Sequence, residues 1–170
     1  MFILVMGKNG SGKSAFAEKL TVNAKGERYY LATMLPYGRK DASRVHKHTA
    51  QRAGLGFITL ELPYAVSAAD IPAESAALLE DVANLLSNAM FDKGLTALEV
   101  FDDIMGLRHR VSCVVAVTIS EFDDGDYDQE TLEYIRSLTE LNRRLSEAAD
   151  AVIEMRGGAP VVTKGESRLC

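Results

Sequence analysis

The sequence predicts one α/β domain over residues 1–170, built on a mostly parallel β-sheet flanked by helices. Two observations indicate this fold class. Short apolar runs of strand length alternate along the chain with longer segments of helical pattern. Several of the apolar runs are continuous rather than alternating, as in strands that are covered on both faces. A length of 170 residues suits one such unit, and no internal repeat or low-complexity linker divides it.

The expected elements are bounded by turn residues. Strands are predicted at Phe2–Met6, Tyr29–Thr33, Phe57–Leu62, Ala76–Leu79, Val111–Thr118, Ala151–Met155 and Val161–Thr163. Helices are predicted at Ser14–Asn23, Ala42–Ala53, Asp81–Phe91 and Gln129–Ala149. The last two strands flank Gly157-Gly158-Ala159-Pro160, which predicts a hairpin that closes one edge of the sheet.

The first strand leads directly into a phosphate-binding motif. The run Gly7-Lys8-Asn9-Gly10-Ser11-Gly12-Lys13-Ser14 matches the pattern GxxxxGK[ST] between a buried strand and a helix, the context that the motif requires. Its glycines allow backbone angles that are closed to other residues, so that successive N–H groups turn inward around a phosphate. Lys13 is predicted to reach the β- and γ-phosphates, and the Ser14 hydroxyl to bind Mg²⁺. We therefore expect a nucleoside-triphosphate site on a P-loop NTPase fold of the RecA-like type.

Composition argues against several other classes of protein. The formal net charge is −5 and there is no Lys/Arg-rich tract, so nothing supports a nucleic-acid partner. The longest apolar runs are far shorter than the ~20 residues that span a bilayer. No basic region precedes the first apolar run, which favours a core strand over a signal peptide. Two cysteines suit a reducing cytoplasm and argue against a disulfide framework. These features predict a cytoplasmic protein without a membrane span.

A carboxylate at the end of a second strand usually accompanies a phosphate-binding loop on the Mg²⁺ side. Leu78-Leu79-Glu80-Asp81 and Val100-Phe101-Asp102-Asp103 both offer one, and spacing alone does not choose between them. Either pair of acids can equally be the polar start of a helix. The acidic segment Phe122–Glu130 is predicted to be a solvated loop. A Ca²⁺ loop is a weaker alternative there, because the twelve-residue ligand spacing fails after Asp128.

A second group of candidate residues lies on the predicted helix 42–53. Arg44, His48 and Arg52 are spaced by four residues and share one helical face, whereas His46 points away from it. Two neighbouring guanidinium groups are expected to lower the pKa of His48 and keep the imidazole neutral and nucleophilic. The same arginines suit phosphate oxygens. The alternative is an exposed basic face that carries an incidental histidine.

Taken together, these residues resemble the bifunctional adenosylcobinamide kinase/adenosylcobinamide-phosphate guanylyltransferase family of cobalamin assembly. The similarity covers most of the chain. The matching segments are Ile3-Leu4-Val5, Gly12-Lys13-Ser14 with Ala17-Glu18, Tyr30-Leu31-Ala32-Thr33, Arg44-Val45-x-x-His48-x-x-x-Arg52, Thr59 with Glu61, Leu78-Leu79-Glu80 with Asn88, and Leu141-Asn142-Arg143-Arg144-Leu145 with Ala148-Ala149-Asp150-Ala151-Val152.

The resemblance implies two reactions on one chain. In the first, ATP or GTP bound with Mg²⁺ by Gly7–Ser14 phosphorylates the aminopropanol hydroxyl of adenosylcobinamide. In the second, His48 attacks the α-phosphorus of GTP, and adenosylcobinamide phosphate then takes up the GMP. The resemblance also implies a homo-oligomer, a trimer.

The resemblance further implies the roles of several residues. Glu80, rather than Asp102, is the expected carboxylate beside Mg²⁺. Arg44, Arg52 and Glu61 are expected to contact the nucleotide. Two alternatives remain open: a P-loop kinase for another small molecule, and a non-catalytic GTP-binding relative.

The chain departs from the family pattern at two loops. Lys8 and Gly10 stand where the family's phosphate loop has glycine and arginine, but the residues that cradle phosphate remain. After Val114–Thr118 the family carries Asn-Glu-Val-Gly, and this chain carries Ile119-Ser120-Glu121-Phe122 and then a slightly shorter acidic loop. Glu121 keeps the place of the glutamate, and the asparagine is missing. Thr139 replaces a glycine expected before Leu141.

Overall fold

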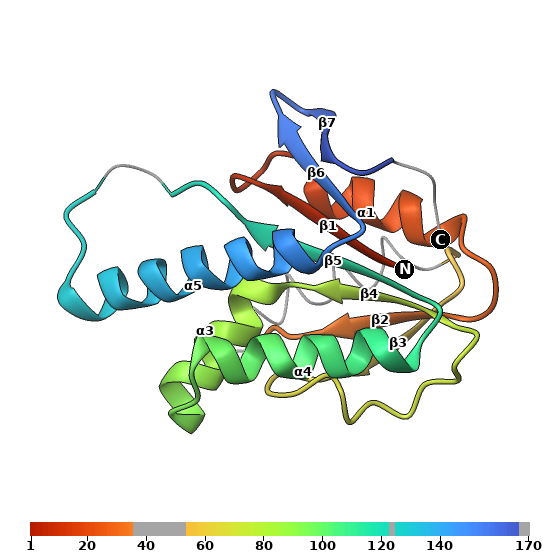
Figure 1. Ribbon diagram of the computed structural model, residues 1–170, viewed down its shortest axis with the longest axis horizontal. Coiled ribbons are helices and arrows are strands. Elements are labelled where there is room, and N and C mark those ends of the chain that lie inside the picture. Colours follow the sequence, from red (N-terminus) through yellow and green to blue (C-terminus); the bar gives the residue numbers. More distant parts are fainter. Residues whose placement is uncertain (36–53, 123–124, 167–170) are drawn as a thin grey trace.

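A seven-stranded sheet forms the centre of the computed structural model, which describes residues 1–35, 54–122 and 125–166 (Figure 1). The strand order is β3-β2-β4-β5-β1-β6-β7. The strands are β1 (Phe2–Gly7), β2 (Arg28–Ala32), β3 (Phe57–Glu61), β4 (Ala76–Glu80), β5 (Cys113–Ile119), β6 (Ala151–Arg156) and β7 (Ala159–Lys164). Neighbouring strands pair in parallel, except for β6 and β7, which form an antiparallel hairpin at one edge. The mostly parallel sheet and its edge hairpin confirm the predicted fold class.

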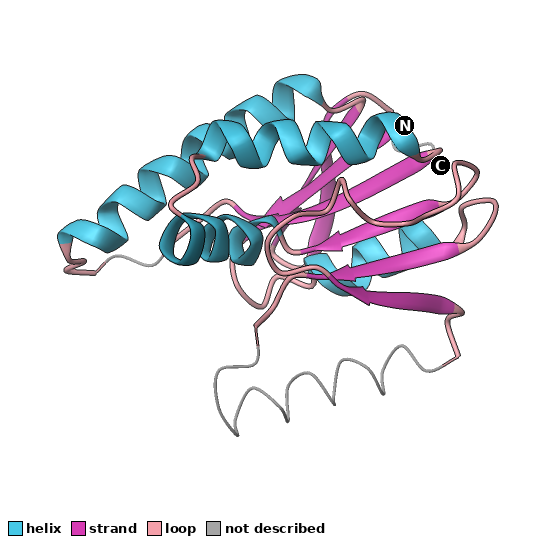
Figure 2. Ribbon diagram, turned by 90° about the horizontal axis from the view of Figure 1, so that it is seen from below, coloured by secondary structure: helices cyan, strands magenta, loops and turns pink. Residues whose placement is uncertain are grey.

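Helices cover both faces of this sheet (Figure 2). They are α1 (Lys13–Val22), α3 (Val82–Lys93), α4 (Ala97–Arg110) and α5 (Gln129–Ala148). In β1, Phe2 and Leu4 pack into the core cluster under α3, α4 and α5. Ile3 and Val5 point the other way, into the cluster that includes residues of α1. A strand buried on both faces has no polar side, which explains the continuous apolar run at the start of the sequence.

Residues 100–103 form part of helix α4, so the interpretation of this segment as a strand is wrong. The sequence offered Val100–Asp103 as a strand that ends in a carboxylate, but these residues lie inside α4. A capping box starts the helix, since the Thr96 side chain accepts from the Glu99 amide and the Glu99 side chain accepts from the Thr96 amide. Val100, Ile104 and Leu107 then form its buried stripe. The helical spacing of these apolar residues outweighs the short apolar run.

Cys113, at the start of β5, is buried in the core. The predicted helix 42–53, with His46 and the Arg44, His48 and Arg52 face, lies outside the described residues. Among the helices that the structure describes, none combines the length and apolar character needed to cross a bilayer.

Candidate functional site

The phosphate-binding loop joins the carboxyl end of β1 to the first turn of α1. Gly12 is the N-cap of α1 and adopts a left-handed conformation, with φ 85° and ψ 7°, which favours glycine. At Gly7 the chain passes so close to its neighbours that a Cβ atom would lie 2.8 Å from Ser11 Oγ and 3.1 Å from the Met155 carbonyl oxygen. The loop therefore requires glycine at both positions, as the motif predicts.

Lys13 lies inside this loop rather than in solvent. Its side chain is buried, and Nζ donates a hydrogen bond to the Lys8 carbonyl oxygen at 3.2 Å. Gly12, the N-cap of α1, has no side chain that could accept from the first-turn N–H groups. An ammonium group and a helix N-terminus facing the same point form a site for an anion.

Ser14 and Glu80 meet across the carboxyl edge of the sheet. Ser14 Oγ donates to Glu80 Oε1 at 2.6 Å, although the two residues belong to α1 and β4. Glu80 Oε2 is buried and has no hydrogen-bond partner in the described part of the chain. Burial, and then the neighbouring Asp81 charge, raise the pKa of Glu80 to about 8, against the lowering effects of the Ser14 hydrogen bond and the Lys13 charge.

The unpartnered Oε2 atom and the adjacent hydroxyl fit a magnesium ion. Mg²⁺ prefers carboxylate and other hard oxygen ligands, and it usually binds through one or two protein groups together with substrate phosphates. Spacing alone left Glu80 and Asp102 open as the carboxylate of the site, and the family resemblance favoured Glu80. Glu80 contacts the serine that follows Lys13, whereas Asp102 lies on the exposed side of α4.

Hydrogen bonds to Asp81 hold the end of β4 in place. The Thr33 hydroxyl donates to the Asp81 carbonyl oxygen at 2.8 Å and accepts from the Asp81 amide at 2.8 Å. The Asp81 carboxylate accepts from the Asn84 amide at 2.7 Å, which starts α3. Asn88 Nδ2 then donates to the carbonyl oxygens of Thr33 and Pro63. The resemblance had singled out Asn88, and in the structure this residue ties α3 to the segment after β2.

Glu61 does not join the phosphate-binding loop. It ends β3, the edge strand, and β2, β4 and β5 separate β3 from β1. Four strand spacings correspond to roughly 19 Å along the sheet. Arg44, His48 and Arg52 lie outside the described residues, so the structure relates neither them nor Glu61 to the nucleotide.

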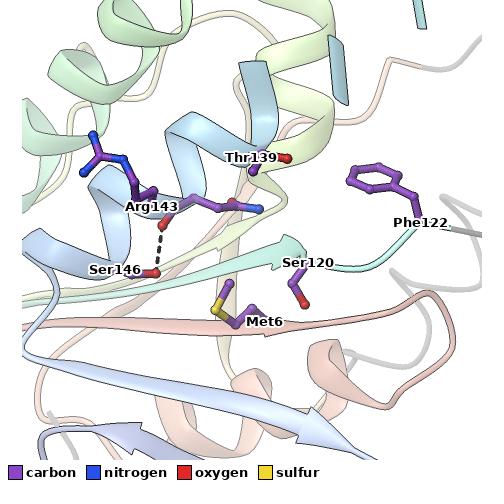
Figure 3. A pocket seen from close by; sticks show the side chains of 7 residues that line it. Met6, Ser120, Phe122, Thr139, Arg143 and Ser146 are labelled. Atoms are coloured by element: carbon purple, nitrogen blue, oxygen red, sulfur yellow. Dashed lines mark hydrogen bonds between the residues drawn. The ribbon is translucent and has the colours of Figure 1, made fainter. Parts of the chain in front are cut away.

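Two cavities lie beside the loop, on the side where β5 ends. The first has a volume of about 140 Å³ and is lined by Lys8, Asn9, Glu121, Phe122 and Tyr127. The second has a volume of about 240 Å³ and is lined by Met6, Ser120, Phe122, Thr139, Asn142, Arg143 and Ser146 (Figure 3). Phe122 is a wall of both. In the sequence, residues 119–122 stand out only as a departure from the family pattern.

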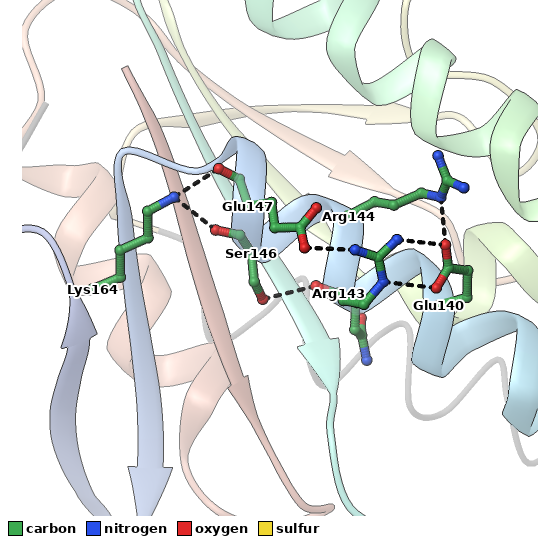
Figure 4. Close-up of polar contacts among 7 residues, drawn as sticks. Glu140, Arg143, Arg144, Ser146, Glu147 and Lys164 are labelled. Atoms are coloured by element: carbon green, nitrogen blue, oxygen red, sulfur yellow. Dashed lines mark hydrogen bonds and ion pairs between the residues drawn. The ribbon is translucent and has the colours of Figure 1, made fainter.

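Hydrogen bonds between β5 and α5 hold two walls of the second cavity together. Thr118 Oγ1 donates to Asn142 Oδ1 at 2.7 Å, and Asn142 Nδ2 donates to the Ile119 carbonyl oxygen at 2.8 Å, so the end of β5 is attached to α5. The Arg143 guanidinium is paired with Glu140 and Glu147 on its own helix (Figure 4). These ion pairs hold the guanidinium group against α5.

These features define a class of protein. A glycine-rich loop lies between a buried strand and a helix, and a lysine is buried inside it. The serine after this lysine donates a hydrogen bond to a carboxylate at the end of another strand. This arrangement is typical of P-loop nucleoside-triphosphate-binding proteins. The family model for cobinamide kinase / cobinamide phosphate guanyltransferase matches residues 3–163. The chain therefore belongs to this family, whose members act as kinase and nucleotidyltransferase in cobalamin biosynthesis.

Solved structures agree on the fold. An ATPase from the type III secretion system of pathogenic bacteria is similar over 92% of this chain, with a TM-score of 0.56 and 13% identity. This chain spans 51% of the length of that ATPase chain. A protein from Pyrococcus horikoshii OT3 is similar over 96% of this chain and 86% of its own, with a TM-score of 0.54 and 10% identity. Both support a RecA-like P-loop fold. Comparison with curated proteins gives no match.

Proposed function

We propose that Gly7–Ser14 and Glu80 form one Mg²⁺–nucleoside triphosphate site that serves both reactions of the family, and that His48 is the guanylylated residue. The observation that carries the nucleotide site is the 2.6 Å hydrogen bond from Ser14 to Glu80, directly after the lysine that is buried inside the loop. The wider organisation that we infer is a single cytoplasmic domain that assembles into a homotrimer, with no nucleic-acid partner.

In the kinase reaction, the loop N–H groups and Lys13 hold the β- and γ-phosphates of ATP or GTP. Ser14 Oγ and the Glu80 carboxylate hold Mg²⁺, which when bound neutralises charge on the phosphates. The buried, unpartnered Glu80 Oε2 supports this assignment, because a buried carboxylate oxygen without a partner is unfavourable unless a cation occupies its surroundings. The acceptor is the aminopropanol hydroxyl of adenosylcobinamide.

In the guanylyl transfer reaction, neutral His48 attacks the α-phosphorus of GTP and pyrophosphate leaves. The phosphate of adenosylcobinamide phosphate then displaces the histidine and takes the GMP. A covalent intermediate divides one difficult transfer into two easier ones. Arg44 and Arg52 offset charge at the attacked phosphorus, and Glu61 contacts the nucleotide. The resemblance of segment 44–52 to the family's guanylylated helix supports the roles of Arg44, His48 and Arg52, and the match at Thr59 and Glu61 supports that of Glu61.

Labelling with [α-³²P]GTP and Mg²⁺ tests the histidine. We expect a covalent label that is labile in acid and stable in alkali, as a phosphoramidate is, and we expect His48→Ala to abolish it. His46→Ala is the matched control and keeps the label, because His46 lies on another face of the predicted helix. An unlabelled wild-type protein that is folded and binds GTP would rule out guanylyl transfer through this residue.

A further inference from the structure

We propose that the cavity lined by Lys8, Asn9, Glu121, Phe122 and Tyr127 is the acceptor subsite of the kinase reaction, and that the Glu121 carboxylate takes the proton from the acceptor hydroxyl. This inference rests on the kinase function proposed above and adds to it the acceptor site and the base.

The topology of the sheet places Glu121 beside the phosphate-binding loop. Strand β5 pairs in parallel with β1, with Ile119 opposite Gly7, so both strands end at the same edge. The Ser120 amide also lies 3.4 Å from the Gly7 carbonyl oxygen. Glu121 follows immediately and lines one side of the cavity, while Lys8 and Asn9 of the loop line the other.

The same cavity borders the place of the terminal phosphate. Lys13 Nζ, the group that reaches the β- and γ-phosphates in this motif, lies 3.2 Å from the carbonyl oxygen of Lys8. Because Lys8 also lines the cavity, an acceptor seated there lies next to the phosphate that is transferred. The Ser14 and Glu80 pair, which links α1 to β4, does not line this cavity.

The size of the cavity determines which part of a corrinoid can enter. The cavity has a volume of about 140 Å³. This space admits a short aminopropanol arm with its hydroxyl group and excludes a corrin macrocycle, which stays outside. The Phe122 ring offers the arm an apolar wall, and Lys8, Asn9 and Glu121 supply polar groups around the hydroxyl.

Two described carboxylates at this edge of the sheet, those of Glu80 and Asp81, are engaged elsewhere. Glu80 accepts from Ser14, and Asp81 accepts from the Asn84 amide at the start of α3. Glu121, in contrast, is exposed and opens on the same cavity as the loop. A proton that it accepts can pass on to solvent.

The two reactions of the enzyme differ in whether the acceptor must lose a proton. In the kinase step, the hydroxyl oxygen bonds to the γ-phosphorus, the bond to the bridging oxygen breaks, and the nucleoside diphosphate leaves. The hydroxyl proton passes to Glu121. The acceptor in guanylyl transfer is a phosphate monoester, whose second pKa is about 6, so it is already ionised at neutral pH. Only the kinase step therefore needs this base.

Glu121→Gln tests the assignment in separate assays of the two reactions. We expect kcat for phosphorylation of adenosylcobinamide to fall about 10²- to 10⁴-fold. Guanylyl transfer to adenosylcobinamide phosphate is expected to stay within a factor of about three. The rise of kinase kcat/KM with pH, which a base produces in the wild type, should be absent in the variant. Glu121→Asp retains a carboxylate and should recover at least about tenfold of the lost kinase rate.

Asp126→Asn is the matched control, because Asp126 is exposed, belongs to the same acidic segment and does not line the cavity. Both of its activities should match the wild type. A Glu121→Gln enzyme that keeps the kinase activity, or loses both activities equally, would overturn the assignment of Glu121. A folded wild-type protein that phosphorylates no cobinamide would instead overturn the kinase function itself, and the acceptor subsite with it.

Discussion

At Glu80, a buried carboxylate has one oxygen bonded to Ser14 and the other without a partner among the described residues. Natural proteins rarely bury a carboxylate in this way unless it binds a cation or a substrate. The sequence could predict that such a residue would end a strand near Lys13 and Ser14, because the motif requires it. Spacing alone could not choose between Glu80 and Asp102, because that choice depends on which strand lies near α1, and only the family resemblance favoured Glu80.

Glu80→Gln tests this residue by thermal unfolding. In the wild type, saturating Mg²⁺ and GTP should raise Tm, since a ligand at 100 times its Kd adds about 2.7 kcal/mol of stability. We expect the variant to lose most of this increase, while its Tm without ligand is not lowered, because the substitution removes a buried ionisable group. Asp102→Asn, the matched control on α4, should respond to Mg²⁺ and GTP as the wild type does. A Glu80→Gln protein with a full ligand-induced increase in Tm would contradict the magnesium assignment.

The hydrogen bonds between Thr33 and Asp81 could not be predicted from the sequence. Thr33 and Asp81 are 48 positions apart, and their hydrogen bonds depend on the pairing of β2 with β4. The register places Ala32 opposite Glu80, so the next residue of each strand end also meets. A local apolar pattern does not show which distant strand becomes the neighbour of β4.

Among the elements, α4 shows where local pattern reading failed. Asp102 and Asp103 interrupt its apolar residues, so a short strand over residues 100–103 was an open interpretation. Asp103 has a structural role, because its carboxylate accepts from the amides of Val66 and Ser67. It thereby holds the segment that follows β3. The signal that was available in the sequence was Thr96 followed three residues later by Glu99, a capping box.

Thr96→Ala measures how much this cap contributes. We expect the free energy of unfolding to fall by about 1 kcal/mol, the typical cost of losing an N-cap side chain. Urea denaturation at neutral pH measures the change. Glu99→Gln with Thr96→Ala should cost less than the sum of the two single changes, because the two residues bond each other. Strictly additive costs would show that the two side chains act independently.

For the whole molecule, strand order was the property that sequence reasoning left open. The continuous apolar runs predicted a two-faced core, and the clusters on either side of β1 confirm it. The sequence did not reveal that β5 lies between β1 and β4. This insertion brings Ser120 and Glu121 to the phosphate-binding loop, so the cavity at Lys8 could not be found from spacing.

The stability of the whole molecule should decrease in acid. The hydrogen bond to Arg143 lowers the pKa of Glu140 from its ordinary value of 4.5 to about 2. Arg144 contributes to this decrease, and partial burial opposes it. A carboxylate whose folded pKa is depressed stabilises the protein above its unfolded pKa and loses that contribution as pH falls through the folded pKa. Hydrogen bonds to Thr96 and Thr131 likewise lower the pKa values of Glu99 and Asp128.

Urea midpoints measured from pH 6 down to pH 2.5 check this dependence. We expect them to fall across the acid range, and we expect Glu140→Gln to show a smaller decrease than the wild type. High salt should reduce the difference between the two proteins, because Glu140 and its arginine partners are largely exposed. Parallel curves for the two proteins would show that Glu140 contributes nothing to acid sensitivity.

The most direct test of the account is to identify the products that the purified protein forms from adenosylcobinamide, GTP and Mg²⁺. Mass spectrometry should first detect the addition of one phosphoryl group to the corrinoid and then the addition of GMP to that phosphate. Omission of Mg²⁺ should prevent both additions. A folded protein that binds GTP and leaves adenosylcobinamide unchanged would contradict the assignment of the P-loop, Ser14 and Glu80 to this chemistry.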